Sequence, residues 1–128
     1  MKLIDTVVLV ACINPNDKLH IQARKHLNAV AIDKQTFIPA PALIEFELEL
    51  KSHGFNEEER VTVFEDLVPL VPKNKVVSQS VKSMAEALTL YLSGMSYFDS
   101  LITSMAKESG ATVVTTDKAI AKVVKTAW

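Results

Sequence analysis

Residues 111–116 form the segment that most constrains what this chain can fold into. They read Ala-Thr-Val-Val-Thr-Thr, an almost purely apolar and β-branched run that is typical of a strand covered on both faces. Shorter β-rich segments lie at Lys2–Ile4, Thr36–Ile38 and Val76–Val77. Helical patterns separate these segments. Strands that alternate with helices predict an α/β fold built on a parallel sheet.

Capping residues, prolines and glycines mark where the helices begin and end. We expect helices over about residues 18–32, from Pro41 to Ser52 or His53, after Asn56, from Ser78 or Ser80 to Gly94, from Ser96 or Asp99 to Gly110, and from 118 to about Lys125. The apolar run Val7–Ile13 is left open between helix and strand, because periodicity does not separate the two over so short a segment.

Composition narrows the class of protein. The chain has 128 residues, of which 48% are hydrophobic and 23% charged, which predicts a single globular domain over residues 1–128. The single cysteine, Cys12, excludes an internal disulfide and favours a reducing compartment such as the cytoplasm; we expect it to be a small, unreactive core residue. The longest apolar run is far shorter than the roughly 20 residues of a membrane helix. A net charge of −1 excludes a broad basic surface for nucleic acid, but not a local one.

Four acidic residues lie where the predicted strands end or the following helices begin. Asp5 follows the first strand directly, and Asp117 follows the strand at 111–116. Glu45 and Asp99 lie near the starts of helices. Because ligands of open parallel sheets bind outside the carboxyl ends of the strands, these four carboxylates are expected to converge. The competing interpretation is that Asp99 and Asp117 only cap helices, a role that fits Asp5 less well because β-prone residues follow it.

Converging carboxylates define a particular chemistry. They repel one another, and a divalent cation relieves that repulsion. Hard oxygen ligands suit Mg²⁺ or Mn²⁺, which activate water and offset the charge on the leaving oxygen in phosphodiester hydrolysis. Hydroxyl groups beside the acids are natural donors that hold such ligands in place; these are Thr6, Ser96, Thr115 and Thr116.

Four segments of the chain resemble, in order, the four acidic motifs of PIN domains. They are Leu3–Thr6, Pro39–Phe46, Ser96–Ile102 and Val113–Lys118, and the likeness covers essentially the whole chain. The resemblance implies a three-layer α/β/α fold with a central parallel sheet of four or five short strands surrounded by helices. It also implies Mg²⁺- or Mn²⁺-dependent cleavage of single-stranded or structured RNA. Stand-alone PIN proteins of this length are most often VapC-type toxins of toxin–antitoxin pairs, which implies a homodimer and a small antitoxin partner.

The resemblance also assigns residues. It carries over to Asp5, Glu45, Asp99 and Asp117 as catalytic, metal-binding acids, and to Thr6 and Thr115 as supporting hydroxyls. Glutamates stand at positions 45, 47 and 49; Glu45 and Glu49 share a helix face, Glu47 points elsewhere, and periodicity alone does not choose among them. The resemblance favours Glu45 over Glu47, because Leu50 and Gly54 then fall where the family's helix pattern has its Leu and Gly. One position departs from the pattern. Val7 stands where the family often has a polar residue, and a valine forms no hydrogen bond to a ligand, which predicts a reduced metal affinity or rate.

Two other functions compete with the nuclease. Val7 and the lack of a clear basic stripe favour a catalytically weak PIN-fold module that binds proteins or regulates. A small phosphatase or a response-regulator-like domain would also gather carboxylates at strand ends, although Lys118 is a poor match for the lysine it requires. For assembly, Ile44 and Leu48 project away from the other apolar residues of their helix, which predicts a symmetric homodimer through helices of residues 41–68.

Overall fold

One parallel sheet of five strands organises the molecule. The computed structural model describes residues 1–128, and its strands lie in the order β3-β2-β1-β4-β5. Their bounds are β1 Lys2–Ile4, β2 Thr36–Pro39, β3 Val76–Val77, β4 Thr112–Val114 and β5 Thr126–Ala127. Every neighbouring pair is parallel. The carboxyl ends of all five strands therefore lie at the same edge of the sheet, which confirms the predicted α/β architecture.

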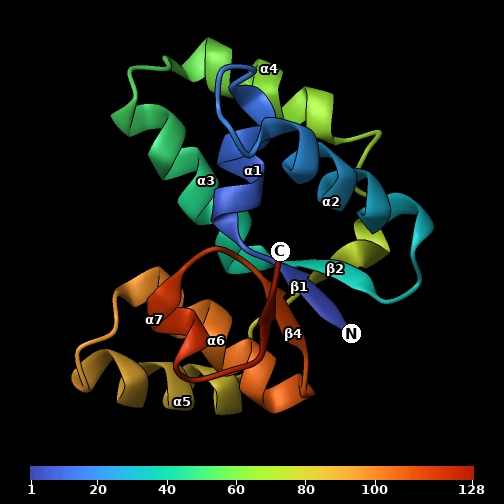
Figure 1. Cartoon of the computed structure of the whole chain (residues 1–128). Helices are drawn as coiled ribbons and strands as arrows, with labels where there is room; N and C mark the ends of the chain where they lie inside the picture. Colours follow the sequence, from blue (N-terminus) through green and yellow to red (C-terminus); the bar gives the residue numbers. More distant parts are fainter.

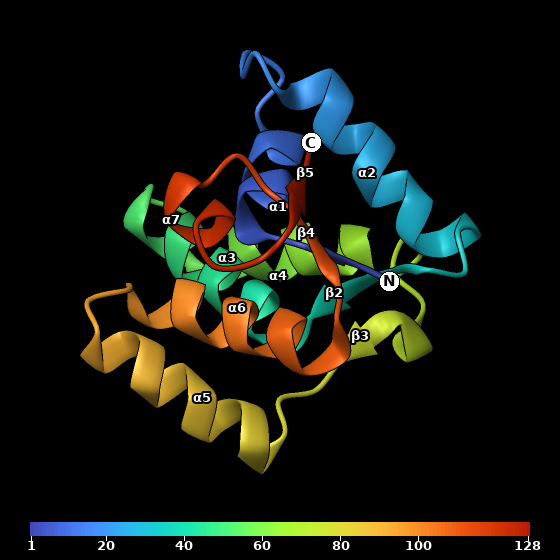
Figure 2. The ribbon, with the colours of Figure 1, turned by 60° about the horizontal axis from the view of Figure 1, so that its bottom comes forward.

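Helices cover both faces of this sheet. They are α1 Thr6–Ile13, α2 His20–Ile32, α3 Ala40–Ser52, α4 Glu57–Leu67, α5 Val81–Leu92, α6 Tyr97–Ser109 and α7 Lys118–Ala121, with a 3-10 turn at Lys73–Lys75. Helices α1 and α2 lie on one side of the sheet and α5 and α6 on the other, in both Figure 1 and Figure 2. These are the three layers that the resemblance implies. None of the helices combines the length and the apolar character that crossing a membrane requires.

Residues 6–13, which the sequence leaves open, form a helix. Their β-branched side chains lower helix propensity by a few tenths of a kcal/mol each. Burial outweighs that cost, because Val8 and Leu9 are fully buried and each such side chain contributes about 1.5–3 kcal/mol. Asp5 is the N-cap of this helix, since its side chain accepts a hydrogen bond from the Thr6 backbone N–H. The sequence-based expectation that Asp5 fits a cap poorly is thus wrong.

The C-terminal region also differs from the prediction. Helix α7 ends at Ala121 rather than near Lys125, and residues 126–127 form the edge strand β5 instead. The Thr115 backbone N–H donates to the Ala127 carbonyl, so pairing with β4 sets the conformation of this segment. Trp128 then packs edge-to-face against His26, with 5.2 Å between the ring centroids. A tryptophan at the last position predicts a packing or dimer contact rather than a binding platform, and here Trp128 makes a packing contact within the chain.

Candidate functional site

Asp5 sits at the centre of the edge where the strands end. It follows β1, the middle strand, and only 5% of its surface is exposed. Its Oδ1 accepts the Thr6 backbone N–H at 2.7 Å, and its Oδ2 accepts the Thr115 hydroxyl at 2.5 Å. The Thr115 Oγ1 in turn accepts the backbone N–H of Asp117 at 2.9 Å. One threonine thus links the ends of β1 and β4 and fixes the orientation of the Asp5 carboxylate.

The four predicted acids lie around one cleft at this edge. The cleft has a volume of about 280 Å³ and is lined by Asp5, Thr6, Val7, Val10, Glu45, Glu49, Asp99 and Asp117; we call it the carboxylate cleft. Its walls come from α1, α3, the first turn of α6 and the residue that caps α7. Asp117 also caps α7 through its Oδ1, and Asp99 lies in the first turn of α6. Asp99 and Asp117 therefore lie in the cleft and also occupy the helix-start positions that the competing interpretation gave them.

Glu49 is a fifth carboxylate of the cleft, and the resemblance gave it no role. It follows Glu45 by one helical turn on α3, so the two share a face. Glu47 points elsewhere, and its Oε1 pairs with the Arg60 Nε of α4 at 2.9 Å. Glu45 therefore lies in the cleft, as preferred for the second acid, whereas Glu47 forms an ion pair outside it. The i, i+4 spacing of Glu45 and Glu49 is the sequence feature that predicts that both side chains face the same cleft.

Burial and like charges raise the pKa values of three of these acids. Burial, followed by the charges of Asp99 and Asp117, raises the pKa of Asp5 from 3.8 to about 6, although hydrogen bonds from Thr115 and Thr6 oppose the rise. Burial also raises the pKa of Glu45 and of Asp99, and neighbouring carboxylates add to both shifts. No lysine, arginine or histidine lines the cleft. The four predicted acids of the cleft therefore have no positive partner from the protein.

The predicted supporting hydroxyls differ in what they do. Thr115 binds Asp5. The Thr6 hydroxyl is buried and has no hydrogen-bond partner of normal geometry, although its proximity to Glu45 lowers the pKa of that carboxyl. Ser96 precedes α6, and its hydroxyl lowers the pKa of Asp99. Thr116 is exposed and does not line the cleft, so it has no visible supporting role.

The residues of the cleft fit a divalent metal ion. The donors are hard carboxylate oxygens without a balancing cation, and the unpartnered Thr6 hydroxyl lies among them. No three acids stand close enough together to enclose an ion by themselves. Mg²⁺ does not require such a cage, because it commonly keeps several waters and binds one or two carboxylates together with substrate phosphate. The donor set therefore suits an ion that shares its shell with water and substrate.

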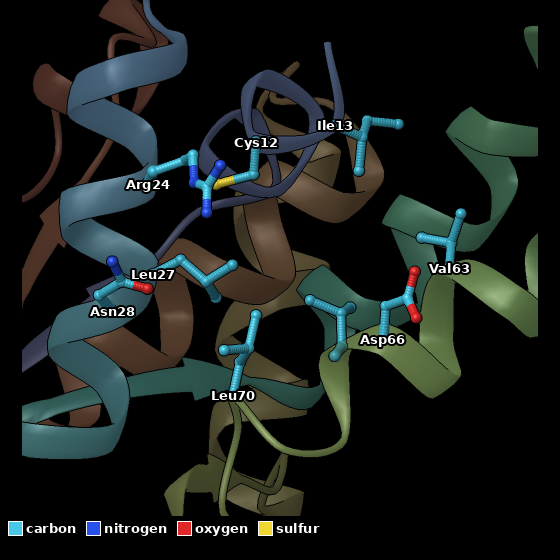
Figure 3. A pocket seen from close by; sticks show the side chains of 9 residues that line it. Cys12, Ile13, Arg24, Leu27, Asn28, Val63, Asp66 and Leu70 are labelled. Atoms are coloured by element: carbon cyan, nitrogen blue, oxygen red, sulfur yellow. The ribbon is translucent and has the colours of Figure 1, made fainter. Parts of the chain in front are cut away.

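A second cavity lies away from the strand ends, between α1, α2 and α4. Figure 3 shows its lining, which includes Cys12, Arg24, Leu27, Asp66 and Leu70, and its volume is about 320 Å³. Burial raises the pKa of the Cys12 thiol to about 11, so this half-buried cysteine is not a nucleophile at neutral pH. The cavity contains one acid and one base but no cluster of titratable groups. The carboxylate cleft is therefore the better candidate for a catalytic site.

Comparison with known proteins agrees with this architecture. The model of the PIN domain family matches residues 2–125, and the chain therefore belongs to the PIN domain family. PIN domains are generally nucleases. No curated protein sequence matches the chain.

Solved structures share the fold at low sequence identity. The FitAcB structure from Neisseria gonorrhoeae has a TM-score of 0.73 and 18% identity, covering 98% of this chain and 96% of that chain. VapBC2 from Rickettsia felis, bound to a promoter DNA fragment, has a TM-score of 0.73 and 19% identity, covering 99% and 98%. VapC20 from Mycobacterium tuberculosis, a sarcin–ricin loop cleaving toxin, has a TM-score of 0.72 and 16% identity, covering 95% and 94%.

Proposed function

We propose that residues 1–128 form a single PIN domain that acts in the cytoplasm as a metal-dependent endoribonuclease, the toxin of a VapBC-type toxin–antitoxin pair. The observation that carries the proposal is the carboxylate cleft, in which Asp5, Glu45, Asp99 and Asp117 meet without any cationic side chain. Membership of the PIN family supports nuclease chemistry. The similarity in fold to VapC20, a sarcin–ricin loop cleaving toxin, supports RNA as the substrate.

In this proposal the four acids hold Mg²⁺ or Mn²⁺, directly or through water. When bound, the ion supplies an activated water and offsets the charge that develops on the leaving oxygen. Asp5 is held ready for this role, because the Thr115 hydroxyl and the Thr6 N–H fix both of its oxygens. Asp117 is oriented through its own backbone N–H, which donates to the same threonine. The protein's contribution is therefore the fixed placement of negative charge at the cleft.

The second candidate function is a catalytically weak PIN-fold module that binds proteins or regulates. The presence of Val7 in the cleft favours it. Val7 lines the cleft beside Asp5 and Thr6, and its side chain offers no hydrogen bond to metal-bound water. The Thr6 hydroxyl beside it lacks a partner. In this second interpretation the fold serves to bind a protein partner, and hydrolysis is slow.

Assembly is a further part of the proposal. Ile44 and Leu48 are 58% and 45% exposed on α3, which supports a symmetric homodimer through helices of the 41–68 region. Light scattering at micromolar concentration would show a dimer. A toxin–antitoxin complex from Klebsiella pneumoniae contains a chain of similar fold, with a TM-score of 0.68, which supports a small antitoxin as the second partner.

The decisive experiment replaces one ligand without changing its shape. We expect Asp5→Asn to lower Mn²⁺-dependent cleavage of a structured RNA by at least about a hundredfold, because the variant removes one negative ligand. The matched control is Asp17→Asn. Asp17 also accepts a backbone N–H through its side chain, from Leu19, but it lies outside the cleft. Cleavage that survives Asp5→Asn at the level of the control would contradict the proposal.

A further inference from the structure

A third cavity lies next to the carboxylate cleft and shares two of its walls. It has a volume of about 300 Å³, and Val10 and Glu49 line both cavities. Its other lining residues include Asn14, Leu50, His53 and Phe55. The cavity lies between the C-terminal ends of α1 and α3, which run side by side from the strand ends in Figure 1. We call it the α1–α3 recess.

The recess is built by the way α3 ends. Gly54 has a φ of +87°, which lets the chain turn back, and the backbone N–H groups of Gly54 and Phe55 donate to the carbonyls of Lys51 and Leu50. This is the Schellman arrangement, in which the residue after the glycine packs on the last turn of the helix. The Arg60 guanidinium also donates to the Phe55 carbonyl. The backbone of Phe55 is therefore fixed before any ligand arrives, and its side chain packs against the hydrophobic core.

The polar groups of the recess comprise a free donor and a free acceptor. The Asn14 Oδ1 accepts the Asn16 backbone N–H at 3.1 Å, which leaves the side-chain amide N–H₂ free to donate. His53 Nδ1 lies 2.7 Å from the Glu49 carbonyl, and a carbonyl only accepts, so Nδ1 carries a proton. The neutral ring then has Nε2 as an acceptor.

We propose that the α1–α3 recess holds an unpaired nucleobase of the RNA strand whose phosphate lies in the carboxylate cleft. This inference rests on the proposed nuclease function. RNA-binding proteins take up unpaired bases by stacking them on aromatic side chains and by hydrogen bonds to the base edge. Phe55 supplies the aromatic surface, and Asn14 and His53 supply the donor and the acceptor.

The charge of the recess selects a base over a phosphate. No lysine or arginine lines it, and Glu49 forms part of its wall. The C-terminal ends of α1 and α3 also carry partial negative charge, which disfavours an anion. A neutral, flat ring has no such penalty. Residues 45, 49 and 53 follow one another at intervals of about one helical turn. The recess therefore extends from about 6 Å to about 12 Å along the helix from Glu45, near enough for a neighbouring nucleotide.

The test compares RNA with and without bases. The probe is a fluorescein-labelled single-stranded RNA of about 12 nucleotides, together with an abasic strand of the same length. Binding is measured by fluorescence anisotropy with Mg²⁺, in the Asp5→Asn background to prevent cleavage. We expect Phe55→Leu to weaken binding of the base-bearing RNA about tenfold and to leave the abasic strand unchanged, since stacking on an aromatic ring contributes that much per base.

The matched control is Phe64→Leu. Phe64 is likewise partly buried against the core, but it packs on Phe46 and lines a different surface depression with Glu47 and Arg60. It should change the binding of neither strand. Asn14→Ala, at an exposed turn, gives a second measurement should Phe55→Leu fail to fold, and should weaken only the base-bearing RNA, about threefold.

Other outcomes would overturn the proposal. Equal weakening of both strands by Phe55→Leu would show a general loss of structure, and no effect on either would show that the recess binds no base. Unchanged RNA binding with a lost affinity for a purified antitoxin would assign the recess to a protein partner. Base-dependent binding without any cleavage by the unaltered protein would reject the proposed nuclease function and support the base site. Asp5-dependent cleavage without any effect of the bases on binding would support the nuclease function and reject the base site.

Discussion

The carboxylate cleft and the α1–α3 recess share Val10 and Glu49 but have opposite chemistry. The cleft collects five carboxylates, and no lysine, arginine or histidine lines it. Glu49 alone approaches a basic ring, with its Oε2 3.9 Å from the Nδ1 of His53. The recess contributes an aromatic ring, an imidazole and an amide. The backbone engages the Nδ1 of His53 and the Oδ1 of Asn14, which leaves the His53 Nε2 and the Asn14 N–H₂ free. The cleft therefore suits a cation, whereas the recess suits a neutral ring with hydrogen-bonding groups on its edge. The carboxylate cleft forms where the strands end, and the α1–α3 recess forms where two helices end.

The largest expected effect separates Glu45 from its neighbour on α3. Glu45→Gln should lower metal-dependent RNA cleavage at least about a hundredfold, because it removes a negative ligand from the cleft. Glu47→Gln is the matched control, since Glu47 is paired with Arg60 outside the cleft. It should change the free energy of unfolding by less than about 1 kcal/mol and leave cleavage intact. The measurement is the initial cleavage rate of each variant. Equal rates would show that a place in the cleft does not distinguish Glu45 from Glu47.

The next effect concerns pH and the metal-free protein. The pKa of Asp5 is raised from 3.8 to about 6, so the folded state binds this proton more tightly than the unfolded state. The Asp5 contribution should therefore stabilise the fold as the pH falls from about 6 to about 4, by an amount on the order of 3 kcal/mol. Urea unfolding in EDTA at several pH values measures it.

Asp5→Asn provides the reference for that measurement, because it lacks the titrating group while all other acids are retained. Asp33, whose pKa is lowered by hydrogen bonds from Thr36 and Gln35, contributes equally to both proteins and cancels in the difference. The wild type should gain stability relative to the variant as the pH falls. A pH-independent difference between the two would contradict the role assigned to burial.

A smaller effect tests the link between β1 and β4. Thr115→Val keeps the shape of the side chain but leaves Asp5 Oδ2 without a donor and the Asp117 N–H without an acceptor. It should lower the free energy of unfolding by about 1–3 kcal/mol. Thr116 is exposed, so Thr116→Val should change the free energy of unfolding by no more than about 0.5 kcal/mol. Thermal unfolding of both variants provides the comparison, and equal stabilities would show that the threonine bridge is unimportant.

The smallest effect falls on the wall that both regions share. Glu49 raises the pKa of Glu45, and its side chain is 46% exposed, so solvent screens the interaction. Glu49→Gln should change cleavage by no more than about fivefold, which corresponds to about 1 kcal/mol for two charges in water. Steady-state rates at saturating Mn²⁺ measure the change. A loss as large as that of Glu45→Gln would make Glu49 a metal ligand in its own right.

The sequence predicts the fold and the meeting of Asp5, Glu45, Asp99 and Asp117 because parallel strands end at one edge and bring the residues after them to that edge. Other features depend on tertiary contacts that no local pattern contains. Residues 6–13 form a helix because their side chains are buried, against their β propensity. Strand β5 consists of only two residues and is specified by β4, so a prediction from local sequence extends α7 through it.

The α1–α3 recess was equally inaccessible from the sequence. Gly54 predicts that α3 ends there, but not that the following ring closes against α1. Periodicity identified a shared face for Glu45 and Glu49, yet it assigned no role to Glu49 because the position of α1 was unknown. The exposure of Ile44 and Leu48, in contrast, follows directly from helical spacing.

The hydrogen bond from Thr115 to Asp5 joins residues 110 positions apart in the chain. Ribosomes build proteins from the N-terminus at about 5–20 residues per second, so β1 and Asp5 emerge seconds before their partner strand. Throughout that interval the nascent chain contains Asp5, Glu45 and later Asp99, but neither the threonine that orients Asp5 nor the fourth acid. Premature termination anywhere before Thr115 leaves an incomplete centre. Synthesis itself therefore delays completion of the carboxylate cleft until most of the polypeptide has been made.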